Sequence, residues 1–138
     1  EYHYSKGYTL LNLGRFDEAV ESLSKAVELR PFAVAYFYRA TAYANLNKPD
    51  LELADYNKII ELEPANAVYY NNRAAYFVKH NKIDLALADL NKAVEVDPNF
   101  SVAYRNRANV YRLKGENEKA KADEKKAEML ESSLKSND

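Results

Sequence analysis

The sequence repeats itself with a period of about 34 residues. Three segments align, namely Tyr36 to Pro64, Tyr70 to Pro98, and Tyr104 onward, and they begin YFYRATAY, YNNRAAYF and YRNRANVY. The prolines that close successive segments are almost equally spaced, at Pro31, Pro64 and Pro98. A period in this range indicates an array of short structural units that bury their apolar faces against one another. Such arrays usually present a surface to a partner, so the repeat predicts architecture better than it predicts the partner.

Each unit is expected to form two helices. In the second unit, apolar residues recur at i, i+4 and i+7 on one face of the first helix, at Tyr36, Ala40 and Tyr43. Asn47 and Lys48 then break the pattern, Asp50 is the expected N-cap of the second helix, and Pro64 stops that helix. The other units follow the same scheme, with breaks at Gly14 and Gly115, second helices starting near Asp17 and Asp84, and a last helix from about Asn117 to Ser133. The prediction is eight helices and no strands.

The length and composition fit one helical domain. The chain has 138 residues, 47% of them hydrophobic, with only 3 Gly and 4 Pro. The expected repeats span about 1–31, 33–64, 67–98 and 101–133, followed by a frayed tail at 134–138. In the last helix, Lys121 and Glu124 stand where earlier repeats carry mostly apolar residues. A helix with a polar outer face needs no further repeat to cover it, so this helix is expected to cap the array.

Charge and cysteine content exclude several classes of protein. The net charge is −1 with both signs interspersed, which argues against a nucleic-acid partner. There is no cysteine, and no apolar run long enough to insert into a membrane. The chain starts at Glu1 without a Met, so it resembles an excised fragment or a processed protein. The compartment is left open, with the cytoplasm favoured.

No arrangement of residues indicates catalysis. The two histidines, His3 and His80, lie in different repeats without metal-ligand spacing. The sequence has no glycine-rich phosphate loop, nucleophile elbow or paired-carboxylate site. We therefore expect no enzyme activity, no cofactor and no metal site.

The pattern resembles the tetratricopeptide repeat family over nearly the whole chain. Small residues occupy the slots where the family's two helices touch: Gly7, Ala40, Ala74 and Ala108 on the first helices, and Ala19, Ala86 and Ala120 on the second. Glu52, Ile59 and His3 depart from the family's residue types. The resemblance implies an all-α, right-handed α-solenoid of four helix-turn-helix repeats, whose first helices line a concave groove. It also implies a protein-protein interaction scaffold rather than an enzyme.

An arginine and an aspartate recur at a constant spacing in three of the repeats. The pairs are Arg39 with Asp55, Arg73 with Asp89, and Arg107 with Asp123, whereas repeat 1 has Lys6 and Ser22. Their joint presence and joint absence predict a salt bridge between the two helices of one repeat. A bidentate fork suits such a contact, so a packing role is favoured over a binding site.

The slots that resemble the family's groove positions carry the functional hypothesis. We expect a partner-binding groove formed by Tyr4, Tyr8, Phe37, Tyr38, Asn71, Asn72, Arg105, Asn106, Asn109 and Arg112. Aromatic rings offer contact area at low entropic cost, and asparagine side chains can pair with a peptide backbone of any sequence. One branch of the family grips the terminal carboxylate of chaperones, but of its clamp residues only Asn72 is matched here. That binding mode is therefore disfavoured.

The predicted function is recognition of an extended peptide or helix from a protein partner, possibly with an acidic segment over repeat 4. The alternative is a structural role, as a piece of a longer repeat array or as a homo-oligomer joined through the aromatic N-terminal face. The solution mass with and without residues 1–14 would separate the two.

Overall fold

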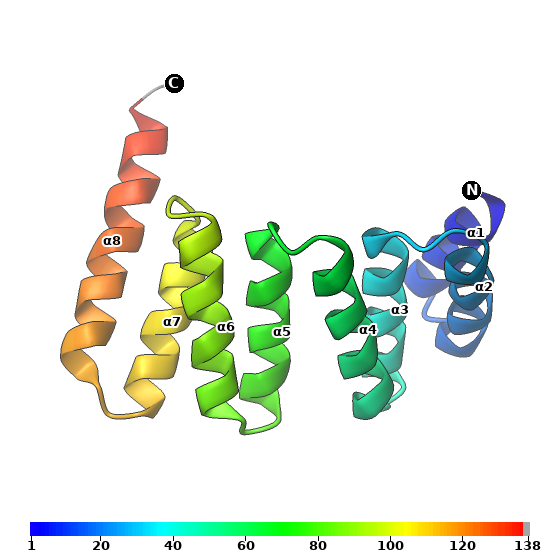
Figure 1. Cartoon of the computed structure of the whole chain (residues 1–138), viewed down its shortest axis with the longest axis horizontal. Helices are drawn as coiled ribbons and strands as arrows, with labels where there is room; N and C mark the ends of the chain where they lie inside the picture. The colour runs from blue at the N-terminus through cyan, green and yellow to red at the C-terminus, as the bar shows by residue number, and fades with distance from the viewer. Residues whose placement is uncertain (137–138) are drawn as a thin grey trace. The chain divides into compact units, whose positions relative to one another are not determined.

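The computed structural model describes residues 1–136, and over these it is helical, with short turns and no strand (Figure 1). The helices pair in sequence order as α1 (Tyr2–Asn12) and α2 (Phe16–Leu29), α3 (Ala33–Asn45) and α4 (Pro49–Leu62), α5 (Ala67–Lys79) and α6 (Ile83–Val96), and α7 (Ser101–Leu113) and α8 (Asn117–Lys135). The all-α, right-handed α-solenoid of helix-turn-helix repeats is confirmed as the fold class. Residues 137 and 138 of the expected tail lie outside the described part.

The chain divides into two compact units. Unit 1 comprises Glu1–Pro64 with α1 to α4, and unit 2 begins at Ala65 and contains α5 to α8. In each unit every helix packs on the next one along the chain, and the two first helices also touch, α1 on α3 and α5 on α7. This packing leaves one side of the first helices available as a surface, because the second helices cover the other side.

Small residues lie where the paired helices approach closely. Gly7 on α1 and all six alanines expected in these slots are buried. A Cβ atom on Gly7 would lie only 2.5 Å from Cγ of Leu23, a fully buried residue of α2. The sequence prediction of these slots is confirmed, and larger side chains there would force the helices apart.

Each pair of helices is joined by a turn with one left-handed residue. That residue is Gly14, Asn47, Asn81 or Gly115, with φ between 53° and 77°. The following residue donates its backbone N–H to the carbonyl five positions earlier, as in Lys82 to Phe77 at 2.7 Å. This hydrogen bond and the left-handed residue form a Schellman-type helix end, which turns the chain within two residues.

The N-cap predicted at Asp50 was wrong by two residues, whereas the second helices do start near Asp17 and Asp84. The second helices begin at Phe16, Pro49 and Ile83, so the N-cap positions are taken by Arg15, Lys48 and Lys82, none of which makes a side-chain cap hydrogen bond. Asp17, Asp50 and Asp84 instead lie inside the first turn. The Schellman turn makes the next helix start at once, and the carboxylates there stabilise the positive end of the helix dipole.

The last helix is longer than predicted. It continues to Lys135, two residues beyond the expected end at Ser133, whereas the other second helices stop two residues before Pro31, Pro64 and Pro98. No proline follows α8, so nothing in the backbone stops it early. Its exposed face carries Lys121 and Glu118, as expected of a polar cap.

Among the described residues, no helix is both long and apolar enough to cross a bilayer.

Candidate partner-binding faces

The arginine–aspartate pairs predicted from their constant spacing are confirmed. In repeat 3, Arg73 donates through Nε and Nη2 to the two carboxylate oxygens of Asp89, both at 2.7 Å. The forks of repeats 2 and 4 have the same geometry, with distances of 2.7 to 2.8 Å. The three aspartates are buried and the arginines are mostly covered, so the forks fix the packing of paired helices.

Further hydrogen bonds from Arg39 and Arg107 reach the preceding repeat. Arg39 on α3 donates through Nη1 to Ser24 Oγ on α2, and Arg107 on α7 donates to Asn91 Oδ1 on α6, both at 3.1 Å. Hydrogen bonding to Asp55 is the main cause that raises the pKa of Arg39 above its usual value. Arg39 and Arg107 thus each make three hydrogen bonds between helices, which supports a role in packing.

Unit 1 carries an aromatic face, formed by Tyr4 and Tyr8 of α1 and Phe37 and Tyr38 of α3. Tyr38 is central, because its ring centroid lies 4.8 Å from that of Tyr8, 6.0 Å from Tyr4 and 5.7 Å from Phe37. Burial, reinforced by the phenol of Tyr38, raises the pKa of Tyr4. Tyr8 remains exposed and borders a shallow depression together with Asn12, Phe37, Tyr38, Thr41 and Asn45. The structure thus brings all four predicted aromatic residues of this unit together.

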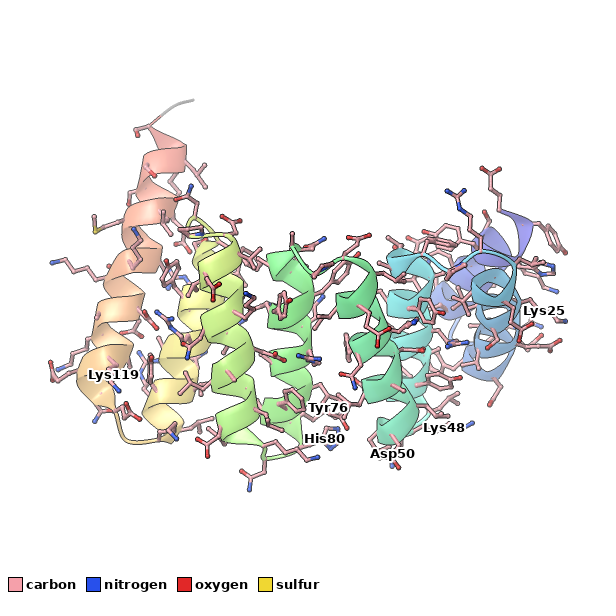
Figure 2. All side chains as sticks on the ribbon, viewed as in Figure 1. Lys25, Lys48, Asp50, Tyr76, His80 and Lys119 are labelled. Atoms are coloured by element: carbon pink, nitrogen blue, oxygen red, sulfur yellow. The ribbon has the colours of Figure 1, made fainter. Side chains whose placement is uncertain are left out.

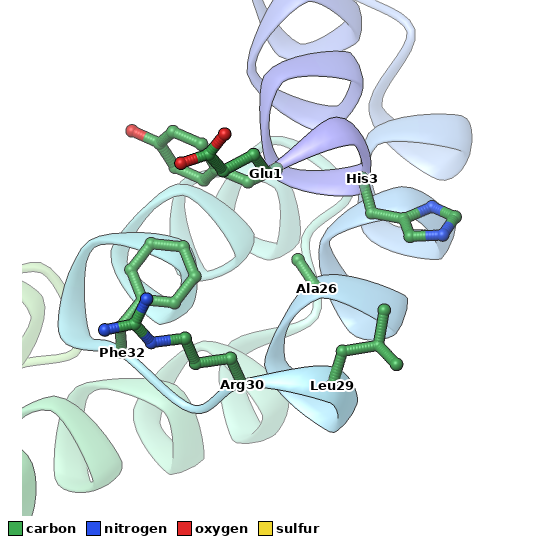
Figure 3. Close-up of a pocket in the computed structure, with 7 residues that line it drawn as sticks. Glu1, His3, Ala26, Leu29, Arg30 and Phe32 are labelled. Atoms are coloured by element: carbon green, nitrogen blue, oxygen red, sulfur yellow. The ribbon is translucent and has the colours of Figure 1, made fainter.

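A separate cavity of about 350 Å³ lies at the end of repeat 1 (Figure 3). Ala26 and Leu29 of α2, Phe32 of the following linker and Tyr4 supply its apolar lining. Glu1, His3 and Arg30 stand around it, and no residue of this set was predicted as a site except Tyr4. The sequence feature that could have pointed to this cavity is His3, which replaces the tyrosine found at the equivalent position in the other repeats.

Unit 2 carries an amide face, formed by Asn71 and Asn72 of α5 and Arg105, Asn106, Asn109 and Arg112 of α7. Asn106 donates through Nδ2 to Oδ1 of the buried Asn71 at 2.8 Å, which links the two first helices. Asn109 accepts a hydrogen bond from Arg112 at 3.0 Å. Asn72 is half-buried and makes no side-chain hydrogen bond within the described part of the chain.

The two arginines of the amide face are already paired with carboxylates of α8. Arg105 donates through Nε and Nη2 to Glu131 at 2.8 and 2.6 Å, and hydrogen bonding to Glu131 raises the pKa of Arg105. Arg112 forms an ion pair with Glu124. Sequence reasoning missed both pairs. They reduce the positive charge that repeat 4 can offer to an acidic segment.

Within unit 2 a hollow of about 290 Å³ opens between α5 and α7. Ala74, Leu90 and Val110 are buried beneath it, and Ala75, Val78 and Leu113 form its sides. The remaining lining residues are Lys79, Asn106 and Asn109. The volume of this hollow lies at the lower end of the range of about 300–1,000 Å³ that is typical of small-molecule sites.

Both histidines pack against tyrosine rings. Among the described residues, no group of three or more His, Cys, Asp and Glu side chains could hold a metal ion. His3 packs edge-on against Tyr2, with ring centroids 5.3 Å apart. His80, at the end of α5, packs on the ring of Tyr76 at 4.3 Å (Figure 2).

Comparison with known protein families accounts for the repeats. Three tetratricopeptide repeat family models match, over residues 4–67, 67–100 and 90–122. The chain belongs to the tetratricopeptide repeat family. Members of this family typically act as non-catalytic interaction modules, and this chain has the fold of a protein-interaction module.

Solved structures with the same fold include tetratricopeptide proteins. The crystal structure of MamA matches with a TM-score of 0.88 and 24% identity, over 97% of this chain and 79% of that protein. YrrB, described as a TPR protein with an unusual peptide-binding site, matches with a TM-score of 0.77 and 22% identity, over 93% of this chain and 66% of that protein. At these identities the likeness shows the fold alone.

A curated relative matches over a shorter segment. The TPR repeat-containing thioredoxin TDX of Arabidopsis thaliana is 36% identical over 69 residues, which is 49% of this chain and 18% of that protein. The chain therefore spans less than a fifth of this curated relative. The chain described here has no cysteine, so its likeness to this relative concerns the repeats and not a redox site.

Proposed function

We propose that this tetratricopeptide protein binds extended peptide segments of protein partners on the first helices of each unit. The aromatic face of unit 1 offers apolar contact area, and the amide face of unit 2 offers hydrogen-bonding groups to a peptide backbone. YrrB, whose fold is the same, is described as having a peptide-binding site, and this supports the proposal by analogy.

The single observation that carries the proposal is the state of the asparagine side chains on the amide face. Asn72 has no hydrogen-bond partner in the described part of the chain, and Asn106 and Asn109 each use only one end of their amide. Amide donors and acceptors that are not used within the chain therefore remain on α5 and α7. A peptide backbone satisfies such groups in pairs without regard to its sequence.

The proposal is tested with peptides selected on the full chain from a random displayed library. Asn72→Ala should lower the affinity for a selected peptide by about 1 kcal/mol, because a net hydrogen bond is lost. Asn117→Ala, on the exposed start of α8, is the matched control and should leave the affinity unchanged. If Asn72→Ala leaves the affinity of every selected peptide unchanged, the binding surface lies elsewhere.

Asn106→Ala is a poor test of binding. The side-chain amide of Asn106 donates a hydrogen bond to Oδ1 of the buried Asn71. Removing it leaves a buried acceptor unpaired, at a cost of about 1–3 kcal/mol in the free energy of unfolding. A loss of affinity in that variant would mix stability with recognition, and Asn72 avoids the problem.

A second candidate function is self-association or continuation of the array through α1. Tyr2 and Leu13 leave 70% and 66% of their surface exposed, and a shallow depression lies between them along α1. The double variant Tyr2→Ser, Leu13→Ser should then lower the solution mass from that of an oligomer to that of a monomer. A wild-type chain that is already monomeric at high concentration would exclude the homo-oligomer.

A further inference from the structure

The hollow of unit 2 is built to receive an aliphatic side chain. Its floor consists of the buried residues Ala74, Leu90 and Val110, and its sides include Val78 and Leu113. Ala74 and Ala75 of α5 contribute only small side chains to its lining. Leu113 keeps 64% of its surface exposed, which is apolar area that a partner would remove from water.

The two asparagines beside the hollow are oriented by their neighbours. The Nδ2 group of Asn106 is held by Asn71, so its Oδ1 is left to accept a hydrogen bond. The Oδ1 atom of Asn109 is held by Arg112, so its Nδ2 is left to donate one. One acceptor and one donor, three residues apart on the same face of α7, match the N–H and C=O of one extended peptide residue.

Lys79 sets the charge at this hollow. The arginines of the amide face, Arg105 and Arg112, are paired with Glu131 and Glu124. Lys79 is exposed at the end of α5 and has no carboxylate partner within the described residues. No acidic side chain lines the hollow. The local charge is therefore positive and complements a carboxylate on the ligand.

We propose that the hollow of unit 2 binds a peptide residue with an aliphatic side chain, beside an acidic side chain that contacts Lys79. Asn106 Oδ1 and Asn109 Nδ2 hold the peptide backbone at this residue. The inference rests on the proposed function and specifies its ligand. It places the acidic contact at the end of α5, the first helix of repeat 3, and not over the arginines of repeat 4.

The test uses synthetic peptides in a Gly/Ser host, acetylated and amidated at their ends, and the full-length chain. One series carries a single Leu followed by Glu at increasing spacing. Matched peptides replace Leu by Ser or Glu by Gln. Dissociation constants come from fluorescence anisotropy, and amide shifts in ¹H–¹⁵N spectra locate the site. The amidated end removes the terminal carboxylate, and a peptide of the same sequence with a free end tests that alternative source of charge.

The best Leu–Glu peptide should shift the amide signals of α5 and α7. Replacing its Leu by Ser should weaken binding by about tenfold or more, because burial of the apolar side chain is lost. Lys79→Gln should weaken it by about threefold to fivefold, as expected for a partly exposed ion pair, with no effect on the Gln peptide. Lys82→Gln is the matched control, since Lys82 is exposed on the same unit outside the hollow.

The outcomes separate this inference from the proposed function. The inference is overturned if Lys79→Gln acts equally on the Glu and Gln peptides, or if only the free-ended peptide binds. It is also overturned if library-selected peptides that need Asn72 contain no aliphatic–acidic pair, although peptide recognition then stands. If no library peptide binds the faces of the first helices, both proposals fail.

Discussion

At the scale of single residues, one missing methyl group sets the distance between α1 and α2. Gly7 lies against Leu23, and there is no room for a Cβ atom between them. The same slot carries alanine in the later repeats, at Ala40, Ala74 and Ala108. In repeat 1 the contact between the two helices therefore leaves no space for a side chain at this slot.

Gly7→Ala should destabilise the protein although alanine favours helices. In an open helix position the exchange would stabilise by about 0.5–1 kcal/mol. Here the new methyl group overlaps Leu23, and we expect a net loss of about 1–3 kcal/mol. Urea denaturation measures it, with Ser5→Ala on the exposed side of α1 as the control. A higher midpoint for Gly7→Ala would show that the helices can separate freely.

A second prediction at this scale concerns alkaline pH. Burial, and to a smaller extent the charge of Glu52, raises the pKa of Tyr56 to about 12. In the unfolded chain a tyrosine titrates at about 10. Between these values the unfolded chain releases a proton that the folded chain keeps, so the free energy of unfolding falls as pH rises.

The contribution of Tyr56 should be fully present below pH of about 10 and lost by about 12, with a size of up to about 2 kcal/mol. Tyr56→Phe removes this titration. Denaturation midpoints measured across the range should therefore fall less steeply in the variant than in the wild type. Parallel curves would mean that Tyr56 ionises in the folded protein as it does in the unfolded chain.

At the scale of helices, the arginine–aspartate fork joins the two members of a pair. Arg73→Ala should cost about 3–5 kcal/mol, because it leaves the buried carboxylate of Asp89 without its partner. A double-mutant cycle on Arg73 and Asp89 should give a coupling energy of about 0.5–3 kcal/mol. The exposed pair Lys92–Glu95 is the reference and should couple by about 0.3–0.5 kcal/mol. Equal coupling in both cycles would contradict a packing role for the fork.

The turn between α5 and α6 gives a prediction on backbone conformation. Asn81 has φ of 56°, which glycine adopts freely, asparagine tolerates and β-branched residues avoid. Asn81→Val should lower the free energy of unfolding by about 1–2 kcal/mol, whereas Asn81→Gly should change it little. Thermal unfolding of the two variants compares them directly. A valine variant as stable as the glycine variant would mean that the turn has rearranged.

At the scale of the whole molecule, periodicity decided what could be predicted. The helices, small slots and Arg–Asp forks recur from one repeat to the next, so each appears several times in register. The pairs Arg105–Glu131 and Asn71–Asn106 occur once, at separations of 26 and 35 residues, and leave no repeated signal. The sequence therefore indicated on which helix faces the groove residues lie. It did not indicate which residues of the same chain form hydrogen bonds with their side chains.

Unit 2 should fold without unit 1. Its core contains Leu90 and Val110, and both of its forks lie inside it, so a cut before Ala65 separates no arginine from its aspartate. A fragment of residues 65–138 should show a helical far-UV spectrum and a cooperative thermal transition. Dispersed amide signals in an NMR spectrum would confirm tertiary packing. A spectrum typical of a disordered chain would show that the first unit is required.

The forks have a consequence for how such a chain can change its length by recombination. Every aspartate of a fork is neutralised by an arginine of the same repeat, 16 residues earlier. The hydrogen bonds by which Arg39 and Arg107 reach the preceding repeat go to neutral side chains, Ser24 and Asn91. Duplicating or deleting one complete repeat would therefore carry both charges of a fork together. The array can gain or lose repeats without ever leaving the buried carboxylate of a fork alone.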